Sequence, residues 1–223
     1  MEERIARAVK QSGRSRSDVT LVAVSKKFSA AYIRAAYAAG IRDFGENYVQ
    51  EFAEKQTALA DLGEARFHLI GHLQSNKARL ACSLFDVVQT ADSIRLIERL
   101  QDAAAARGRL LDVLLEIKLS PEQAKAGAAP DDIPQLLGAA QKCTHLRLRG
   151  LMTMPPWSED PEHSRPYFRK LAVLARQYQL RDLSMGMSGD LEVAIEEGAT
   201  IIRIGTALFG PRPKPQTSTI PAA

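Results

Sequence analysis

A lysine lies where the first apolar run of the chain ends, and its position favours chemistry on a carbonyl group. The run is Leu21–Ser25, and the two-residue period of a strand places Val22, Val24 and Lys26 on one face. If that face points into an apolar interior, burial favours the neutral amine of Lys26, which is the form that attacks a carbonyl carbon. The alternative is a solvated lysine at a strand end, which we expect for the neighbouring Lys27.

An arginine inside an apolar run and two glycine-containing turns indicate an anionic ligand. Arg203 lies within the run Thr200–Ile204, where a guanidinium needs a partner, and a structural ion pair is the alternative to a ligand. Ser188 and the pair Gly205 and Thr206 follow the last two apolar runs, and such turns suit a phosphate group. A strand-end lysine, an internal arginine and a phosphate site together suggest pyridoxal phosphate.

The remaining candidate groups predict less. His68 and His72 have the spacing of a metal-binding pair, but they fall on a strand and its end, so we expect no metal site and a core role for His68. The P-loop and dinucleotide-binding fingerprints are absent. Cys82 and Cys143 belong to no cysteine cluster, which argues against a disulfide framework or structural zinc and favours a cytoplasmic location.

The elements that must position these residues are eight short apolar runs separated by longer helical patterns. The runs are Leu21–Ser25, Asp43–Glu46, Arg66–Ile70, Asp86–Thr90, Leu111–Ile117, Leu146–Thr153, Asp182–Met187 and Thr200–Ile204. Alternating strands and helices predict parallel strands joined by crossover helices. Eight such units predict a single-domain α/β fold, a (β/α)8 TIM-type barrel over residues 1–210. A doubly wound open sheet is the competing architecture.

The two ends of the chain depart from a regular barrel. The segment Glu2–Gln11 has a helical pattern, and we expect it to cover one side of the barrel. Pro211, Pro213 and Pro215 forbid a regular helix after the eighth strand, so we expect the last helix of the barrel to be missing. Residues 211–223 are expected to form a proline-rich, disordered tail.

The composition is that of an ordinary globular protein, with 45% apolar and 25% charged residues. No stretch approaches the roughly 18 apolar residues of a membrane span, so we expect no membrane partner. The net charge of +4 is spread along the chain without a lysine or arginine block, so we expect no nucleic-acid partner. Nothing in the sequence demands a second subunit, and we expect a monomer.

Six segments, which occur in order along nearly the whole chain, form a highly specific combination. They are Ala23–Lys26, Phe44–Glu51, His68–Lys77, Arg149–Met154, Leu183–Ser188 and Arg203–Gly210. Together they resemble the pyridoxal phosphate homeostasis proteins, which are single-domain relatives of the alanine racemase barrel. One visible departure is Gly189, which stands where the family commonly has an acidic residue, and Asp190 follows it.

The resemblance implies a role in cofactor binding for seven residues. Lys26 would form a Schiff base with pyridoxal 5'-phosphate. The others are Asn47 beside the cofactor ring, Arg203 facing the pyridine nitrogen, and Met187 (through its backbone), Ser188, Gly205 and Thr206 around the phosphate.

The same residues favour a carrier over an enzyme. Arginine stays protonated, so Arg203 opposite the pyridine nitrogen would leave that nitrogen unprotonated and the ring a poor electron sink. In the related racemases a second domain supplies the other acid/base group, and only thirteen residues follow Gly210 here. Tyr48 and His72 are the nearby candidates for such a group.

We therefore expect a protein that binds, stores and delivers pyridoxal phosphate to recipient apo-enzymes without turnover. One alternative is a weak amino-acid racemase or another pyridoxal phosphate enzyme. The other is a basic nucleic-acid-binding module, which no aromatic and basic stripe supports.

Overall fold

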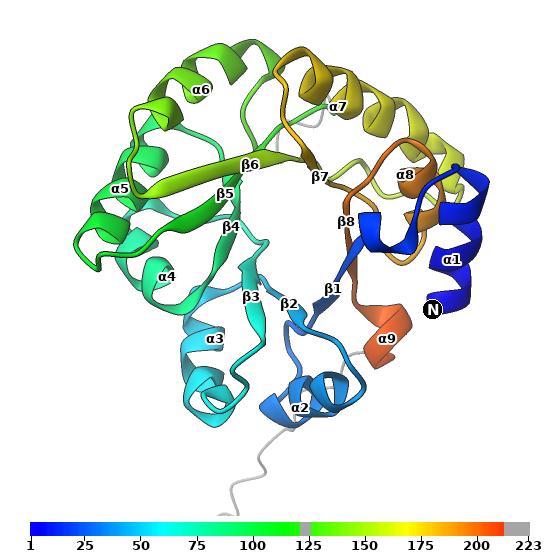
Figure 1. The fold of residues 1–223 in the computed structure, drawn as a ribbon, viewed down its shortest axis with the longest axis horizontal. Helices are drawn as coiled ribbons and strands as arrows, with labels where there is room; N and C mark the ends of the chain where they lie inside the picture. The colour runs from blue at the N-terminus through cyan, green and yellow to red at the C-terminus, as the bar shows by residue number, and fades with distance from the viewer. Residues whose placement is uncertain (121–125, 212–223) are drawn as a thin grey trace, which may run out of the picture.

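Eight parallel strands close into a barrel in the computed structural model, which describes residues 1–120 and 126–211 (Figure 1). The strands are β1 (Thr20–Val24), β2 (Asp43–Glu46), β3 (Arg66–Leu69), β4 (Val87–Ala91), β5 (Leu111–Glu116), β6 (Leu146–Met152), β7 (Asp182–Ser184) and β8 (Ile201–Ile204). They pair in chain order, and β8 returns to pair with β1. The predicted barrel is confirmed, and the open sheet is excluded because its edge strands would be unpaired.

Helices before, between and after the strands surround the barrel (Figure 1). They are α1 (Glu2–Gln11), α2 (Ala30–Ala38), α3 (Val49–Gln56), α4 (Ala78–Leu84), α5 (Ile94–Ala105), α6 (Ile133–Gln141), α7 (Arg165–Gln177), α8 (Leu191–Glu196) and α9 (Thr206–Phe209). Short 3-10 turns are η1 (Arg16–Asp18), η2 (Thr57–Leu59), η3 (Ser75–Lys77), η4 (Pro130–Asp132) and η5 (Pro161–Ser164). Helix α5 illustrates why these segments are helical. At its start the Ser93 side chain accepts a hydrogen bond from Leu96 N, and Leu96 and Leu100 form a buried apolar face.

Helix α1 covers the side of the barrel beyond α8, as predicted from its pattern (Figure 1). Its Ile5 and Val9 side chains are buried. Arg4 adds a bidentate ion pair with Glu192 of α8, with N–O distances of 2.6 and 2.7 Å. The helix thus shields apolar surface on a side where the chain supplies little helix of its own after β8.

The chain after β8 contains one helical turn, α9, so the expectation that no helix follows β8 was wrong for these four residues. Phe209 of this turn packs against Phe28, with ring centroids 5.1 Å apart. The turn ends at Gly210, whose φ of +77° lies in the left-handed region, and Pro211 follows. Of the tail predicted over residues 211–223, residues 212–223 lie outside the described residues.

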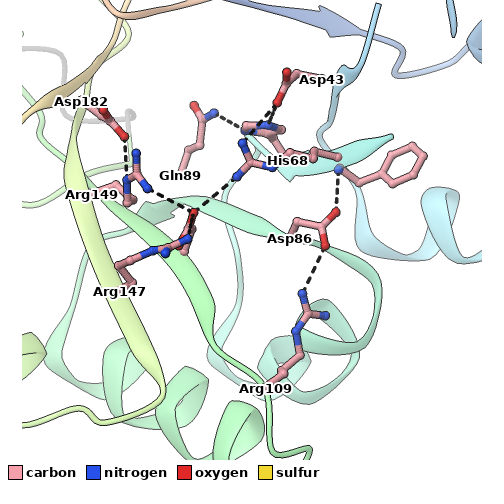
Figure 2. Close-up of polar contacts among 11 residues, drawn as sticks. Asp43, His68, Asp86, Gln89, Arg109, Arg147, Arg149 and Asp182 are labelled. Carbon is pink, nitrogen blue, oxygen red and sulfur yellow. Dashed lines mark hydrogen bonds and ion pairs between the residues drawn. The ribbon is translucent and has the colours of Figure 1, made fainter. Parts of the chain in front are cut away.

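The barrel interior is apolar in the middle and charged at its amino-terminal end. Val22, Val87, Leu114, Met152 and Ile201 form the apolar layer. Beneath it lies a ring of paired arginine and aspartate side chains, which includes the ion pairs of Arg147 with Asp112 and of Arg149 with Asp182 (Figure 2). A cavity of about 490 Å³ opens among them, and ion pairs such as Arg66 with Asp112 and Arg149 with Asp182 line it, which is typical of a stabilising barrel floor.

Candidate functional site

A cavity of about 370 Å³ at the carboxyl ends of the strands brings together every site residue predicted from the sequence. Its walls include Lys26, Asn47, Met187, Ser188, Arg203, Gly205 and Thr206. Apolar groups complete the walls, chiefly Val24, Ile70, Met154 and Trp157. The volume and the mixture of apolar walls with a few polar groups are typical of a small-molecule site.

Lys26 lies two residues after the end of β1 and is half-buried beside Val24, which is itself buried. Its neighbour Lys27 is exposed, has a φ of +65°, and donates its backbone N–H to Glu51 Oε1 at 2.5 Å. The turn therefore separates the two lysines as the strand period predicts. Lys26 lines the cavity and Lys27 lies in solvent.

Arg203 lies on the floor of the cavity and is only 3% exposed. Its guanidinium donates from Nη1 to Ser184 Oγ at 2.6 Å and from Nη2 to the Thr153 carbonyl at 2.9 Å. Burial lowers the pKa of Arg203 to about 10, against the opposing effect of the Glu116 and Asp190 carboxylates, so the group stays protonated at neutral pH. Among the described residues its two acceptors are a hydroxyl and a carbonyl, and no carboxylate lies within ion-pair distance of it.

Asn47 follows β2 and presents an acceptor to the cavity. Its Oδ1 atom is buried and has no hydrogen-bond partner among the described residues. A buried acceptor without a donor is costly, so the site suits a ligand that supplies one. Gly71 makes this placement possible, because a Cβ atom there would lie 2.2 Å from the Asn47 carbonyl oxygen.

The turn after β7 is held by a carboxylate. Asp190 Oδ1 accepts the backbone N–H of Met187 at 2.7 Å, and its Oδ2 accepts the Ser164 hydroxyl at 2.8 Å. The Met187 N–H is therefore already hydrogen-bonded within the turn. Ser188 Oγ accepts the backbone N–H of Ala207 at 3.4 Å, which joins this turn to the one after β8.

The turn after β8 keeps one wall of the cavity open. A Cβ atom at Gly205 would lie 3.5 Å from Val24 Cβ, which is ordinary contact, so packing within the protein does not require glycine there. The missing side chain instead leaves backbone and the Thr206 hydroxyl within reach of a ligand. This combination suits a phosphate group, and the phosphate site at this turn stays a prediction.

Sequence reasoning missed Glu116, the last residue of β5. Its side chain is 2% exposed, and its Oε2 atom has no hydrogen-bond partner among the described residues. Burial raises the pKa of Glu116 to about 7, the nearby Asp92 charge adds to the rise, and Arg203 opposes it. A signal was available, because a strand period puts Glu116 on the same face as Asp112 and Leu114, which line the barrel interior.

Glu116 lines a second cavity of about 590 Å³ beside the first, and the two share the side chains of Met154, Trp157 and Met187. The candidates named from sequence proximity lie elsewhere. Tyr48 is 52% exposed, and His72 faces Asp92 with a distance of 3.6 Å between Nδ1 and Oδ2. Neither Tyr48 nor His72 lines the two cavities, whereas Glu116 lines the second one.

The model of the family described as "Alanine racemase, N-terminal domain" matches residues 2–213. The pyridoxal phosphate homeostasis protein of Pseudomonas aeruginosa is 46% identical over 211 residues, which cover 94% of this chain and 91% of that relative. The chain belongs to this family. The family resemblance that the six segments indicate is thereby confirmed over most of the chain.

Solved structures agree with this membership. PipY of Synechococcus elongatus, solved with PLP bound, is 42% identical to this chain. The two structures align with a TM-score of 0.81 over 92% of this chain and all of PipY. Alanine racemase of Clostridium difficile shares the fold at 12% identity, with a TM-score of 0.69 over 96% of this chain and 57% of that one. Within the described ranges, no helix of this family member has the length and apolar character to cross a membrane.

Proposed function

We propose that this protein binds pyridoxal 5'-phosphate through a Schiff base on Lys26 and acts in cellular homeostasis of this cofactor without turnover. It would store the cofactor, buffer its free level and deliver it to recipient apo-enzymes, as a monomer in the cytoplasm. The observation that carries the proposal is the single cavity that collects the amine, the buried arginine, the unpaired acceptor and the hydroxyl groups. The PLP-bound relative of the same fold supports it.

Each group in the cavity has a chemical role toward such a ligand. The Lys26 amine would form a C=N bond with the cofactor aldehyde as one water molecule leaves. Arg203 would face the pyridine nitrogen as a donor, and Asn47 Oδ1 would accept from a ring hydroxyl. Ser188 and Thr206 would bind the phosphate beside Gly205. Because the Met187 N–H is held by Asp190, we assign Met187 to the wall of the site.

The Schiff base is tested by borohydride reduction followed by peptide mapping. We expect one pyridoxyl group, attached to Lys26, and loss of the absorption band of the bound cofactor in Lys26→Ala. Lys27→Ala is the matched control, since it removes the neighbouring amine that lies in solvent. A label on another lysine of the wild-type protein would overturn the assignment.

The phosphate site is tested by comparing two ligands. Ser188→Ala combined with Thr206→Val should weaken pyridoxal phosphate much more than pyridoxal, by about 1.5–3 kcal/mol for each lost charge-assisted hydrogen bond. Trp157 is the only tryptophan in the chain and lines the cavity, so its fluorescence reports binding of both ligands. Equal weakening of both ligands would place the phosphate elsewhere.

One observation favours the second candidate function, a weak amino-acid racemase. Racemisation needs an acid/base group on each face of the substrate, and Glu116 is a titratable carboxyl beside the cavity in addition to Lys26. Against it, a charged Arg203 would leave the pyridine nitrogen unprotonated. We expect no conversion of L- or D-amino acids above the free-cofactor background. Sustained turnover that disappears in both Lys26→Ala and Glu116→Gln would establish the racemase instead.

A further inference from the structure

A chain of hydrogen bonds runs from Arg203 through the barrel interior toward its amino-terminal end. Arg203 Nη1 donates to Ser184 Oγ at 2.6 Å, and Ser184 Oγ donates to Gln89 Oε1 at 2.6 Å. Gln89 Nε2 contacts His68 Nδ1 at 2.9 Å, and His68 Nε2 contacts Asp43 Oδ1 at 2.8 Å (Figure 2). The four residues from Arg203 to His68 are each no more than 3% exposed, so water does not compete for these bonds.

The two ends of the chain determine where every proton lies. A guanidinium only donates, so Ser184 accepts from Arg203, and its hydroxyl donates to the carbonyl oxygen of Gln89. The amide NH₂ of Gln89 must then donate to His68 Nδ1, which carries no proton. His68 therefore holds its proton on Nε2 and donates it to Asp43, a carboxylate that accepts.

The arrangement matters because Arg203 has few other contacts. Its second described acceptor is the Thr153 carbonyl, and no carboxylate lies within ion-pair distance among the described residues. Ser184 lies on β7 and Gln89 on β4, so the chain crosses the barrel rather than following one strand. Rotation of the Gln89 amide would present NH₂ to Ser184 and remove the acceptor that orients its hydroxyl.

We propose that Gln89 and His68 are positioning residues for Arg203. They hold the Ser184 hydroxyl in the one orientation that keeps its lone pair toward the guanidinium, and so they fix the arginine on the cavity floor. This inference rests on the proposed function only in so far as Arg203 contacts the cofactor.

The first test compares three variants of β4 by their affinity for pyridoxal phosphate. Gln89→Leu removes the amide and leaves Ser184 and His68 without their partner, and we expect affinity to fall about tenfold or more. Gln89→Glu keeps an acceptor for Ser184, and we expect affinity within about threefold of wild type. Val88→Ala is the matched control, because Val88 is fully buried in the layer between strands and helices and its side chain takes no part in the hydrogen-bond chain. The affinity of Val88→Ala for pyridoxal phosphate should stay within about twofold of the wild-type value.

The second test reads the protons directly in cofactor-free protein by ¹⁵N NMR of the histidine rings. The sequence has four histidines, and a His68→Asn variant assigns the signals of His68. We expect a proton on Nε2 alone in the wild type and on both ring nitrogens in Gln89→Glu, where the new carboxylate can only accept. A protonated Nδ1 in the wild type would contradict the proposed direction of the chain.

The outcomes separate this inference from the proposed function. Equal losses of affinity in Gln89→Leu and Val88→Ala, or an unchanged affinity in Gln89→Leu, would overturn the positioning role. A wild-type protein that binds no pyridoxal phosphate would overturn the proposed function. The NMR test would then still decide the proton arrangement.

Discussion

Replacing Glu116 by glutamine removes a buried ionisable group and keeps its size, so its effect on stability should depend on pH. The folded protein holds the Glu116 proton up to a pKa of about 7, whereas the unfolded chain releases it near the ordinary value of 4.5. Between these values unfolding releases a proton, and the stability of the wild type therefore falls as the pH rises. Above about pH 7 both states are ionised and the effect levels off.

The magnitude follows from the distance between the two pKa values. Each pH unit in the window is worth about 1.4 kcal/mol, so the wild type should lose about 2–3 kcal/mol between pH 5 and pH 8 through this carboxyl. Glu116→Gln does not titrate. Its stability relative to wild type should therefore be about 2–3 kcal/mol more favourable at pH 8 than at pH 5.

The assay is chemical denaturation of cofactor-free wild type and variant at the two pH values. Taking the difference between the proteins cancels the other titrating groups. Glu54→Gln is the matched control, since Glu54 is exposed on α3, and its difference from wild type should not change with pH. A Glu116→Gln difference that is the same at pH 5 and pH 8 would refute the reasoning and mean that Glu116 is ionised in the folded protein across this range.

Two further variants test packing and charge beside the cavity. Gly71→Ala should lower the unfolding free energy by at least about 1–3 kcal/mol and weaken cofactor binding, because the new Cβ would lie 2.2 Å from the Asn47 carbonyl oxygen. Gly63→Ala is the control: a Cβ atom there would meet open space, so this variant should be neutral in the same assays. Lys55→Met should lower the unfolding free energy by about 3–5 kcal/mol at neutral pH, measured with denaturant, because Lys55 Nζ lies 3.0 Å from the fully buried Glu46 carboxylate. Adding Glu46→Gln should recover most of this loss. A double variant no more stable than Lys55→Met would contradict the pairing.

Local patterns in the sequence determined the fold and the first candidate of the site. Eight apolar runs that alternate with helical patterns predict parallel strands with helices outside, and they favour a closed barrel over a doubly wound open sheet. The period of one strand was enough to separate Lys26 from Lys27. Asn47 came from the resemblance of longer segments, since a lone asparagine after a strand carries no pattern of its own.

Only the tertiary structure decided how the polar groups satisfy one another. Ser184 and Gln89 are 95 positions apart, and the closure of the barrel brings them within 2.6 Å. The same closure gives Arg203 a hydroxyl and a carbonyl as acceptors, and leaves Glu116 buried beside the cavity. Strand register and the shape of the interior set these contacts. Spacing along one strand carries no information about which side chain of a distant strand will face it.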